Sequence, residues 1–310
     1  MVDTTLERHD SMAKAAGQSG LRKMLQRKST IAFLMTLPLI LLIFLLVAYP
    51  AGYAVYLASL SKNMKRFVGF ANFTYLFKRE AFWLVVEQSV IFAVTAVIFK
   101  AILGFIVAHF VHNIPSKGQR KWRGMLLVPW VIPPAMSTLA WLWLFDPSYS
   151  AFNWIFAQFG GGRIPWLGDA AWARFCVILV NIWIGSPFFM IMYLAALKSV
   201  PEQLYEAAEI DGATWWQRIW YITLPMMRNI IAITTLFSLI VTFANFDIVR
   251  VLTAGGPVDR THVFATWAFR LGIESGDIPL GAAVSLFMVP ILSVAAIFIL
   301  RDVNRRGNEA

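Results

Sequence analysis

The feature that most constrains this chain is a run of 33 residues, 29–61, that contains no charged side chain. A helix needs about 20 apolar residues to cross the hydrocarbon core of a bilayer. The run therefore predicts a membrane-spanning helix, in which Pro38 and Pro50 are expected to introduce kinks. Because the run is far longer than the apolar part of a secretory signal, no cleavable signal is expected.

The composition supports the same class. The 310 residues are 59% hydrophobic and 14% charged, with a mean hydropathy of +0.65, whereas soluble domains are about 25% charged. The net charge of +10 invites a nucleic-acid partner, but the basic residues flank apolar runs instead of lining one face, so that function is excluded. With one cysteine, Cys176, the chain has no internal disulfide. The prediction is an all-α integral membrane protein.

Six apolar segments are expected to cross the membrane: 29–58, 84–112, 124–145, 175–197, 229–250 and 280–300. Together they define a predicted transmembrane domain at 29–305, with polar tails at 1–28 and 306–310. Residues 252–279 are expected to form the last external loop.

The positive-inside rule orients the six predicted spans. Of the 27 Lys and Arg residues, sixteen fall in the pieces assigned to the inside and ten in those assigned to the outside. The two segments that flank the first span contain nearly equal numbers of Lys and Arg residues, so the later turns determine the orientation. Both termini are expected to be cytoplasmic, together with the polar segment at 198–227.

The segment 198–227 reads as a helical hairpin. Ser199 and Glu202 form a candidate capping box, Gly212 a candidate helix end, and Thr214 with Gln217 a second helix start. Glu202, Glu206 and Glu209 recur at i, i+4 and i+7, a spacing at which like charges repel by roughly 0.2–0.5 kcal/mol per pair. Two interpretations stay open: a helix that enters a groove lined with cations, or a solvated amphipathic helix.

The same hairpin carries a resemblance to the inner-membrane permeases of ATP-binding-cassette (ABC) importers. Seven positions at the family's fixed spacing match its signature: Glu206, Ala207, Ala208, Gly212, Ile222, Leu224 and Pro225. The resemblance covers about residues 30–305 and implies the type I ABC importer permease fold in the cell inner membrane. It also implies that Glu206, Ala207, Ala208 and Gly212 couple the chain to a separate ATPase.

The segment Leu252-Thr-Ala-Gly-Gly-Pro257, followed by Thr261, is similar to the carbohydrate branch of that family, the maltose/glycerol-3-phosphate type. This branch implies a sugar or a sugar-derived solute as cargo. The implied partners are a second homologous permease, two ATPase subunits that bind ATP and Mg, an external substrate-binding protein and the lipid bilayer.

The sequence contains no motif for nucleotide binding, metal binding or catalysis. A P-loop requires Gly-Lys before Ser or Thr, and the dipeptide Gly-Lys does not occur in the sequence. The four histidines lack the spacing of metal ligands, and the predicted spans contain no Ser/His/Asp set or carboxylate pair of the kind that enzymes use for catalysis. We therefore expect no enzyme activity, no metal and no cofactor in this chain. Two rivals remain, a self-sufficient secondary transporter or channel and a membrane enzyme, although neither acidic relays nor inverted repeats are visible.

Lys100 lies deep in the second predicted span, where a charged residue is by default a functional hypothesis. It either has a structural role, with a carboxylate partner or an inward snorkel, or contacts an anionic or highly polar substrate.

A cavity for the sugar is expected between the fourth and fifth predicted spans. Asn181, Gly185 and Phe188 recur at i, i+4 and i+7 with Trp183 at their flank, and Ser238, Thr242 and Asn245 have the same spacing. An unpaired amide in hydrocarbon costs several kcal/mol, so these side chains are expected to face a cavity. Interhelical hydrogen bonding is the alternative. The segments also resemble the family's cavity-lining segments.

Overall fold

The computed structural model describes residues 28–307, and the chain divides into two compact units, residues 1–56 and 57–310. The predicted tail at 1–28, apart from Lys28, and the last three residues of the predicted tail at 306–310 lie outside the described residues. Regular structure within the described range is helical, with one isolated β-bridge between Leu60 and Phe67. This confirms the all-α prediction.

The described part of the first unit is one long helix. It consists of α2 (Lys28–Ile43), a π-helical turn η1 (Phe44–Ala48) and most of α3 (Tyr49–Ala58). The wider π turn lies just before Pro50, whose missing N–H interrupts the helical ladder. Residues 31–58 are long and apolar enough to cross a membrane, and none of their most apolar window is buried. An apolar helix exposed on all sides requires lipid or another protein chain around it.

The second unit contains four further stretches that are long and apolar enough to span a membrane. Its described elements are α4 (Ala71–Phe77), α5 (Glu80–His112), α6 (Ser116–Leu126), α7 (Val128–Val131), α8 (Pro134–Leu144), α9 (Ala151–Gln158), α10 (Ala170–Ser199), α11 (Glu202–Ile210), α12 (Trp215–Arg218), η2 (Ile219–Thr223), α13 (Leu224–Phe243), α14 (Asp247–Leu252), α15 (Phe264–Phe269), η3 (Arg270–Glu274), α16 (Ile278–Leu286) and α17 (Met288–Gly307).

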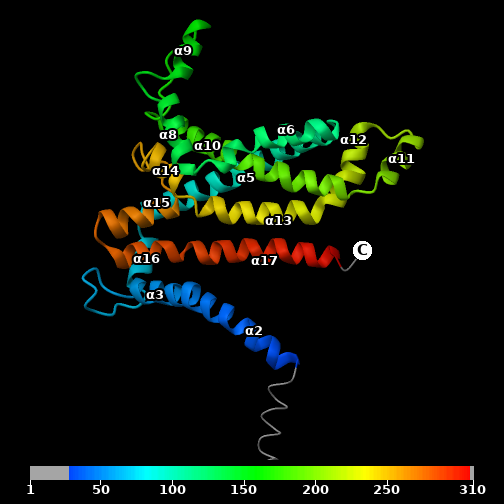
Figure 1. Ribbon diagram of the computed structural model, residues 1–310. Coiled ribbons are helices and arrows are strands. Elements are labelled where there is room, and N and C mark those ends of the chain that lie inside the picture. The colour runs from blue at the N-terminus through cyan, green and yellow to red at the C-terminus, as the bar shows by residue number, and fades with distance from the viewer. Residues whose placement is uncertain (1–27, 308–310) are drawn as a thin grey trace, which may run out of the picture. The chain divides into compact units, whose positions relative to one another are not determined.

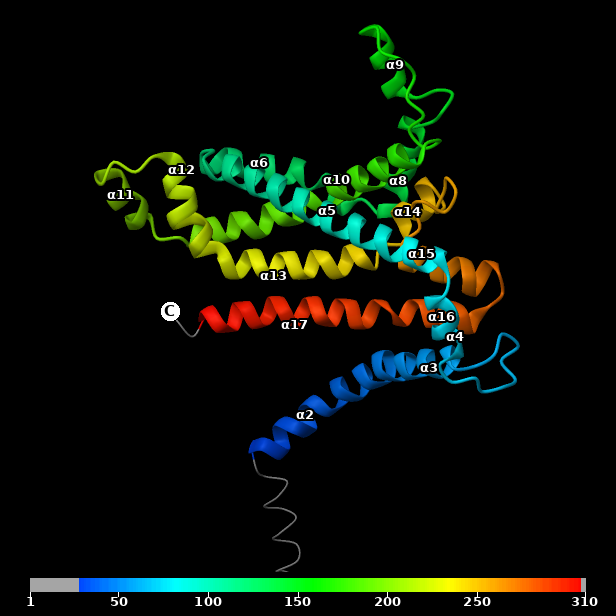
Figure 2. The same cartoon turned by 180° about the vertical axis from the view of Figure 1, so that it is seen from behind.

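Helices α5, α10 and α13 pack together at the centre of this unit, and α17 runs along α13 (Figures 1 and 2). Helices α11 and α12 project at one end of the three helices, which we call the hairpin end. Helices α9, α14 and α15 lie at the opposite end, which we call the loop end. The polar hairpin and the Gly-Gly-Pro segment are thus at opposite ends of the same helices.

The packing of α5 against α10 depends on Gly104. A methyl group at this position would overlap the Cβ of Phe189 and lie 3.1 Å from the backbone nitrogen of Met190. Glycine is therefore required for the two backbones to approach this closely. Around the contact, a buried cluster includes Ala108 and Val111 of α5 and Tyr193 of α10. This cluster positions α10, and with it the chain that leads into the hairpin.

The third predicted span, 124–145, is not one continuous helix. Helix α6 ends at Leu126, and the chain continues through the short α7 into α8. Ile132 and Pro133, which each precede a proline, have extended ψ angles of 133° and 128°. The ring of the following proline disfavours helical geometry at both positions. Five candidate spans are found within the described residues, so the sixth crossing stays a prediction.

The helices of the last two predicted spans are also interrupted. Helix α13 ends at Phe243, and α14 begins at Asp247, so the predicted fifth span at 229–250 is interrupted near its end. The predicted sixth span at 280–300 lies within the candidate span 278–301, in which a turn at Phe287 separates α16 from α17. The segment 252–279, expected as a loop, contains α15 and η3. Phe264 and Trp267 of α15 are buried against the core. The apolar pattern of this segment is too short and irregular to predict such a buried helix from the sequence.

The arrangement within the second unit gives a direct topological test. Residues 118 and 212 lie towards the hairpin end, and residues 161 and 256 lie towards the loop end. Because basic residues favour the cytoplasmic side, single cysteines at 118 and 212 should be labelled only from the cytoplasm. Cysteines at 161 and 256 should be labelled only from the outside. Labelling of position 118 from the outside would contradict the predicted orientation, and an unreactive control is the cysteine-free Cys176→Ala chain.

Candidate functional site

The hairpin of α11 and α12 is built largely as its sequence predicts. Gly212 has a φ of +73°, a left-handed conformation that suits glycine. Thr214 and Gln217 form a capping box: the Thr214 hydroxyl accepts from the Gln217 backbone N–H, and the Gln217 side chain accepts from that of Thr214. The predicted cap at Ser199 is wrong. Its hydroxyl donates to the Ala196 carbonyl, 2.7 Å away, because α10 runs on through Ser199.

One face of the hairpin is exposed. Glu206 and Ala207 are exposed, and the side chain of Ile210 is 87% exposed. Glu209 forms an ion pair with Arg218 of α12, so it does not stand free beside the other two glutamates. No residue of α11 is buried. Glu206, Ala207 and Ile210 therefore share an exposed surface on α11.

Two side-chain contacts and one helix connect the hairpin to the membrane helices. The Tyr205 hydroxyl lies 2.9 Å from the Thr223 hydroxyl in η2. The indole N–H of Trp215 donates to Nε2 of His109 at the end of α5, over 3.2 Å. Residues 215–243 then form a continuous helical stretch of 29 residues through α12, η2 and α13. The hairpin is therefore rigidly connected to the interior of the bundle.

A second polar site lies inside the bundle, where α5, α10 and α13 meet. Lys100 of α5 is buried, with 3% of its surface exposed, and its Nζ donates to the Thr242 hydroxyl of α13 over 2.7 Å. On α10, a methyl group at Gly185 would overlap Cδ of Lys100 and lie 3.3 Å from its Nζ. Gly185 is therefore the space in which the lysine side chain lies. We call Lys100, Gly185 and Thr242 the lysine cluster.

Two other residues predicted to line the substrate path lie on the same helix faces as members of the lysine cluster. Asn181 lies one turn from Gly185, and Ser238 lies one turn from Thr242, so each shares its neighbour's face. Both are buried. The Oδ1 atom of Asn181 has no hydrogen-bond partner among the described residues. Since buried polar groups are normally paired, this oxygen is available to a ligand or to a residue of another chain.

The remaining predicted lining residues lie elsewhere. Trp183 packs edge-on against Trp141 of α8 and borders an apolar cavity of about 270 Å³ together with Leu103 and Pro129. Phe188 is half-buried between the rings of Trp130 and Phe237. Asn245 lies beyond α13, and its Oδ1 accepts from the backbone N–H of Ile248 over 3.3 Å. It caps the start of α14 because α13 ends before it.

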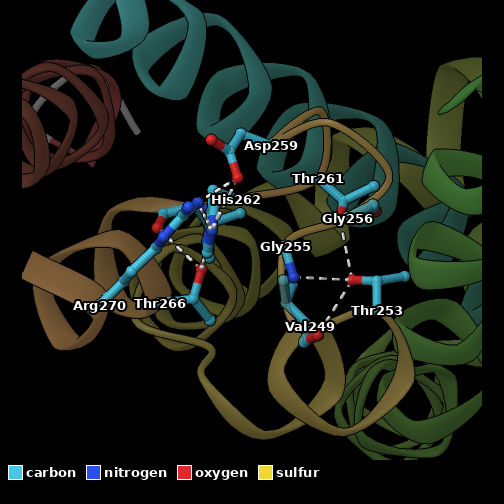
Figure 3. A network of polar contacts seen from close by, with 10 residues as sticks. Val249, Thr253, Gly255, Gly256, Asp259, Thr261, His262, Thr266 and Arg270 are labelled. Atoms are coloured by element: carbon cyan, nitrogen blue, oxygen red, sulfur yellow. Dashed lines mark hydrogen bonds and ion pairs between the residues drawn. The ribbon is translucent and has the colours of Figure 1, made fainter. Parts of the chain in front are cut away.

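The Gly-Gly-Pro segment at the loop end encloses a buried histidine that the sequence did not single out. Figure 3 shows His262 between Thr266 and Arg270, with Asp259 nearby. Its Nδ1 lies 3.1 Å from the Thr266 hydroxyl, and its Nε2 lies 3.1 Å from Nη1 of Arg270, which forms an ion pair with Asp259. Burial, the largest cause, lowers the pKa of His262 to about 4. The neutral ring then accepts from Arg270 and donates to Thr266.

The backbone of the segment is held by two threonines, also drawn in Figure 3. The Thr253 hydroxyl donates to the Val249 carbonyl over 3.0 Å, and the Thr261 hydroxyl donates to the Gly256 carbonyl over 2.7 Å. Gly255 has a φ of +89°, and a methyl group there would overlap the His262 ring. The glycines in this segment thus allow the chain to fold around the histidine.

A helical membrane protein with an exposed hairpin at one end and a buried polar cluster between its central helices belongs to the broad class of transport proteins. Residues 100–306 match the model of the binding-protein-dependent transport system inner membrane component family. The chain belongs to this family. The match begins at Lys100 and includes the hairpin, the lysine cluster and the Gly-Gly-Pro segment.

Individual relatives extend the comparison. The chain is 31% identical over 283 residues to the trehalose/maltose transport system permease protein MalF of Thermococcus litoralis, covering 89% of this chain and 95% of the relative. It is 30% identical to the sulfoquinovosyl glycerol transport system permease protein SmoG of Agrobacterium fabrum, over 87% and 89% of the two chains. A chain of a bacterial ABC transporter that imports the acidic polysaccharide alginate superposes with a TM-score of 0.79 at 25% identity, covering 92% of this chain and 98% of the other.

Substitution of Gly255 tests the construction of the Gly-Gly-Pro segment. Gly255→Ala should destabilise the protein by about 1–3 kcal/mol, the usual cost of overpacking, because the added methyl overlaps His262 and the backbone has positive φ. The measurement is the thermal unfolding midpoint in detergent. Gly160→Ala is the matched control, since its φ is +74° but nothing lies within 4 Å of the added methyl. Equal midpoints for the two variants would contradict the proposed packing.

Proposed function

We propose that this chain is the permease subunit through which a sugar or sugar-derived solute enters the cell. An external binding protein delivers the solute, and separate ATPase subunits that bind ATP and Mg drive the transport. The observation that carries the proposal is the hairpin: the fixed-spacing motif lies on an exposed surface joined by one continuous helix to a buried polar cluster. The relatives named for maltose, for a sulfoquinovosyl glycerol and for alginate support a saccharide as cargo.

The exposed face of α11 is the proposed docking surface for an ATPase subunit. Glu206, Ala207 and Ile210 are exposed there, and Ala207 is small enough for close approach of another backbone. Residues 215–243 are helical throughout but bend at η2, between α12 and α13 (Figure 1), so a displacement of the hairpin is passed along this bent helix towards Thr242. ATP-driven movement is thereby transmitted to the lysine cluster.

A second, homologous permease is the proposed partner within the membrane. The helix at 31–56 carries apolar side chains along its whole length, including Met35 and Leu45. A second permease that covers these side chains would complete the translocation path. With two permeases, two hairpins are available for two ATPase subunits.

Two substitutions in the hairpin test the docking role. Gly212→Val places a β-branched residue at a φ of +73°, which such side chains rarely adopt, and Glu206→Lys reverses an exposed charge. Both should reduce substrate-stimulated ATP hydrolysis by the purified importer at least about tenfold, the equivalent of 1.4 kcal/mol. The matched control is Glu202→Lys, an equal charge reversal at the start of α11. Wild-type ATPase activity in both variants would contradict the docking role.

The buried amide of Asn181 tests the translocation path. Asn181→Ala should lower uptake of the transported saccharide by about tenfold, the loss of one or two hydrogen bonds to hydroxyl groups. Binding of the ATPase subunits should be unchanged, as judged by co-purification. The control is Ser186→Ala, because the Ser186 hydroxyl bonds only within α10, to the Ile182 carbonyl. We expect Asn245→Ala to impair uptake as well, through the start of α14. Normal uptake in Asn181→Ala, or loss of assembly, would make Asn181 a structural residue.

A further inference from the structure

The charge of Lys100 has no counter-charge in the described part of the chain. Its Nζ makes one described hydrogen bond, to the neutral Thr242 hydroxyl, although an ammonium group has three donors. Neither structural explanation for a lysine at this depth applies. No carboxylate pairs with it among the described residues, and with 3% of its surface exposed it does not reach solvent.

Neither of the two helices packed against Lys100, α10 and α13, carries an acid, and Asp247, five residues beyond Thr242 at the start of α14, is exposed and forms no ion pair with the lysine in the described structure. On α5 itself, Glu87 is thirteen residues away, which corresponds to about 20 Å along the helix axis at 1.5 Å per residue. An unpaired cation in such surroundings is costly and requires an anion from elsewhere.

We infer that Lys100 binds an anionic group of the transported solute, so that the cargo is an acidic saccharide carrying a carboxylate or sulfonate. This inference rests on the proposed function, since it assigns the cargo of the same site. Three residues around the ammonium group support this assignment. Gly185 provides the space that the lysine side chain occupies, Thr242 accepts a hydrogen bond from the ammonium group, and the Asn181 oxygen, which has no partner among the described residues, lies one turn away on the Gly185 face.

The division of roles follows from the chemistry of the side chains. The ammonium group supplies the positive charge that pairs with the carboxylate or sulfonate, and two of its three N–H donors have no partner among the described residues. The Asn181 amide and the Ser238 hydroxyl are suited to the neutral hydroxyl groups of a sugar ring. Lys100 is buried in this conformation and contacts Gly185 of α10 and Thr242 of α13, so access of a solute to its ammonium group requires these helices to move.

The test uses the complete importer, with its second permease, ATPase subunits and binding protein, in lipid nanodiscs. The probes are a panel of neutral disaccharides and the corresponding disaccharides in which one hexose is a uronate or a 6-sulfonate. Binding to the cognate binding protein is measured first by calorimetry. Stimulation of ATP hydrolysis and uptake into proteoliposomes are then measured for each probe.

Uptake should be observed with the acidic members of the panel and fall at least about tenfold for their neutral counterparts. Lys100→Gln keeps a donor for Thr242 but removes the charge, and should lower uptake of the acidic probe by a similar factor. Lys62→Gln, at an exposed loop lysine, is the matched control and should transport at the wild-type rate.

Equal uptake of neutral and acidic probes by the wild-type importer would overturn the inference while leaving the proposed function intact. Wild-type uptake of the acidic probe by Lys100→Gln would do the same. Because the wild-type comparison needs no variant, the inference remains testable if Lys100→Gln fails to assemble. Absence of stimulation by every saccharide would contradict the proposed function itself.

Discussion

The close packing of α5 against α10 is the contact on which the rest of the second unit depends. Two glycines make it possible from opposite sides. Gly104 of α5 admits the backbone of α10 at Phe189 and Met190, and Gly185 of α10 admits the side chain of Lys100. A side chain at either position would separate the helices, and the cost of such overpacking is typically about 1–3 kcal/mol. The lysine is thereby buried where α13 also meets the pair.

The same contact links the interior to the hairpin. Helix α10 leads directly into α11, and the chain returns to the interior through the helical stretch 215–243, which ends beside Lys100 at Thr242. The bond between Trp215 and His109 attaches this stretch to the end of α5. All three central helices are thus connected to the hairpin, either through the chain or through a side-chain contact. A force applied to the hairpin acts on the helices that form the lysine cluster.

Much of this arrangement could be predicted from the sequence, because long apolar runs, glycine at a helix end and a capping box are local signals. The family resemblance and the left-handed Gly212 are confirmed. The prediction of the third span as a single helix is wrong, because Pro133 and Pro134 disfavour helical geometry at the residues before them, and this effect outweighs the apolar run.

Periodicity also misplaced some of the predicted site residues. It assigned Asn245 to the face of Thr242, but it cannot indicate that α13 ends at Phe243. Trp183, two residues from Asn181, lies about 200° around the helix at 3.6 residues per turn and faces α8. The partner of Lys100 is 142 residues away in sequence, so no local pattern predicts it.

The central claim is that the exposed face of α11 binds an ATPase subunit. Site-specific cross-linking from Ile210→Cys, whose parent side chain is 87% exposed, tests it most directly in membranes that contain the whole importer. Cys176→Ala is introduced first, so that the new thiol is the only one in this chain. The account predicts a cross-linked product with the ATP-binding subunit, formed from position 210 but not from a cysteine at the loop-end position 161. A product from position 161, or none from position 210 in an importer that hydrolyses ATP normally, would contradict it.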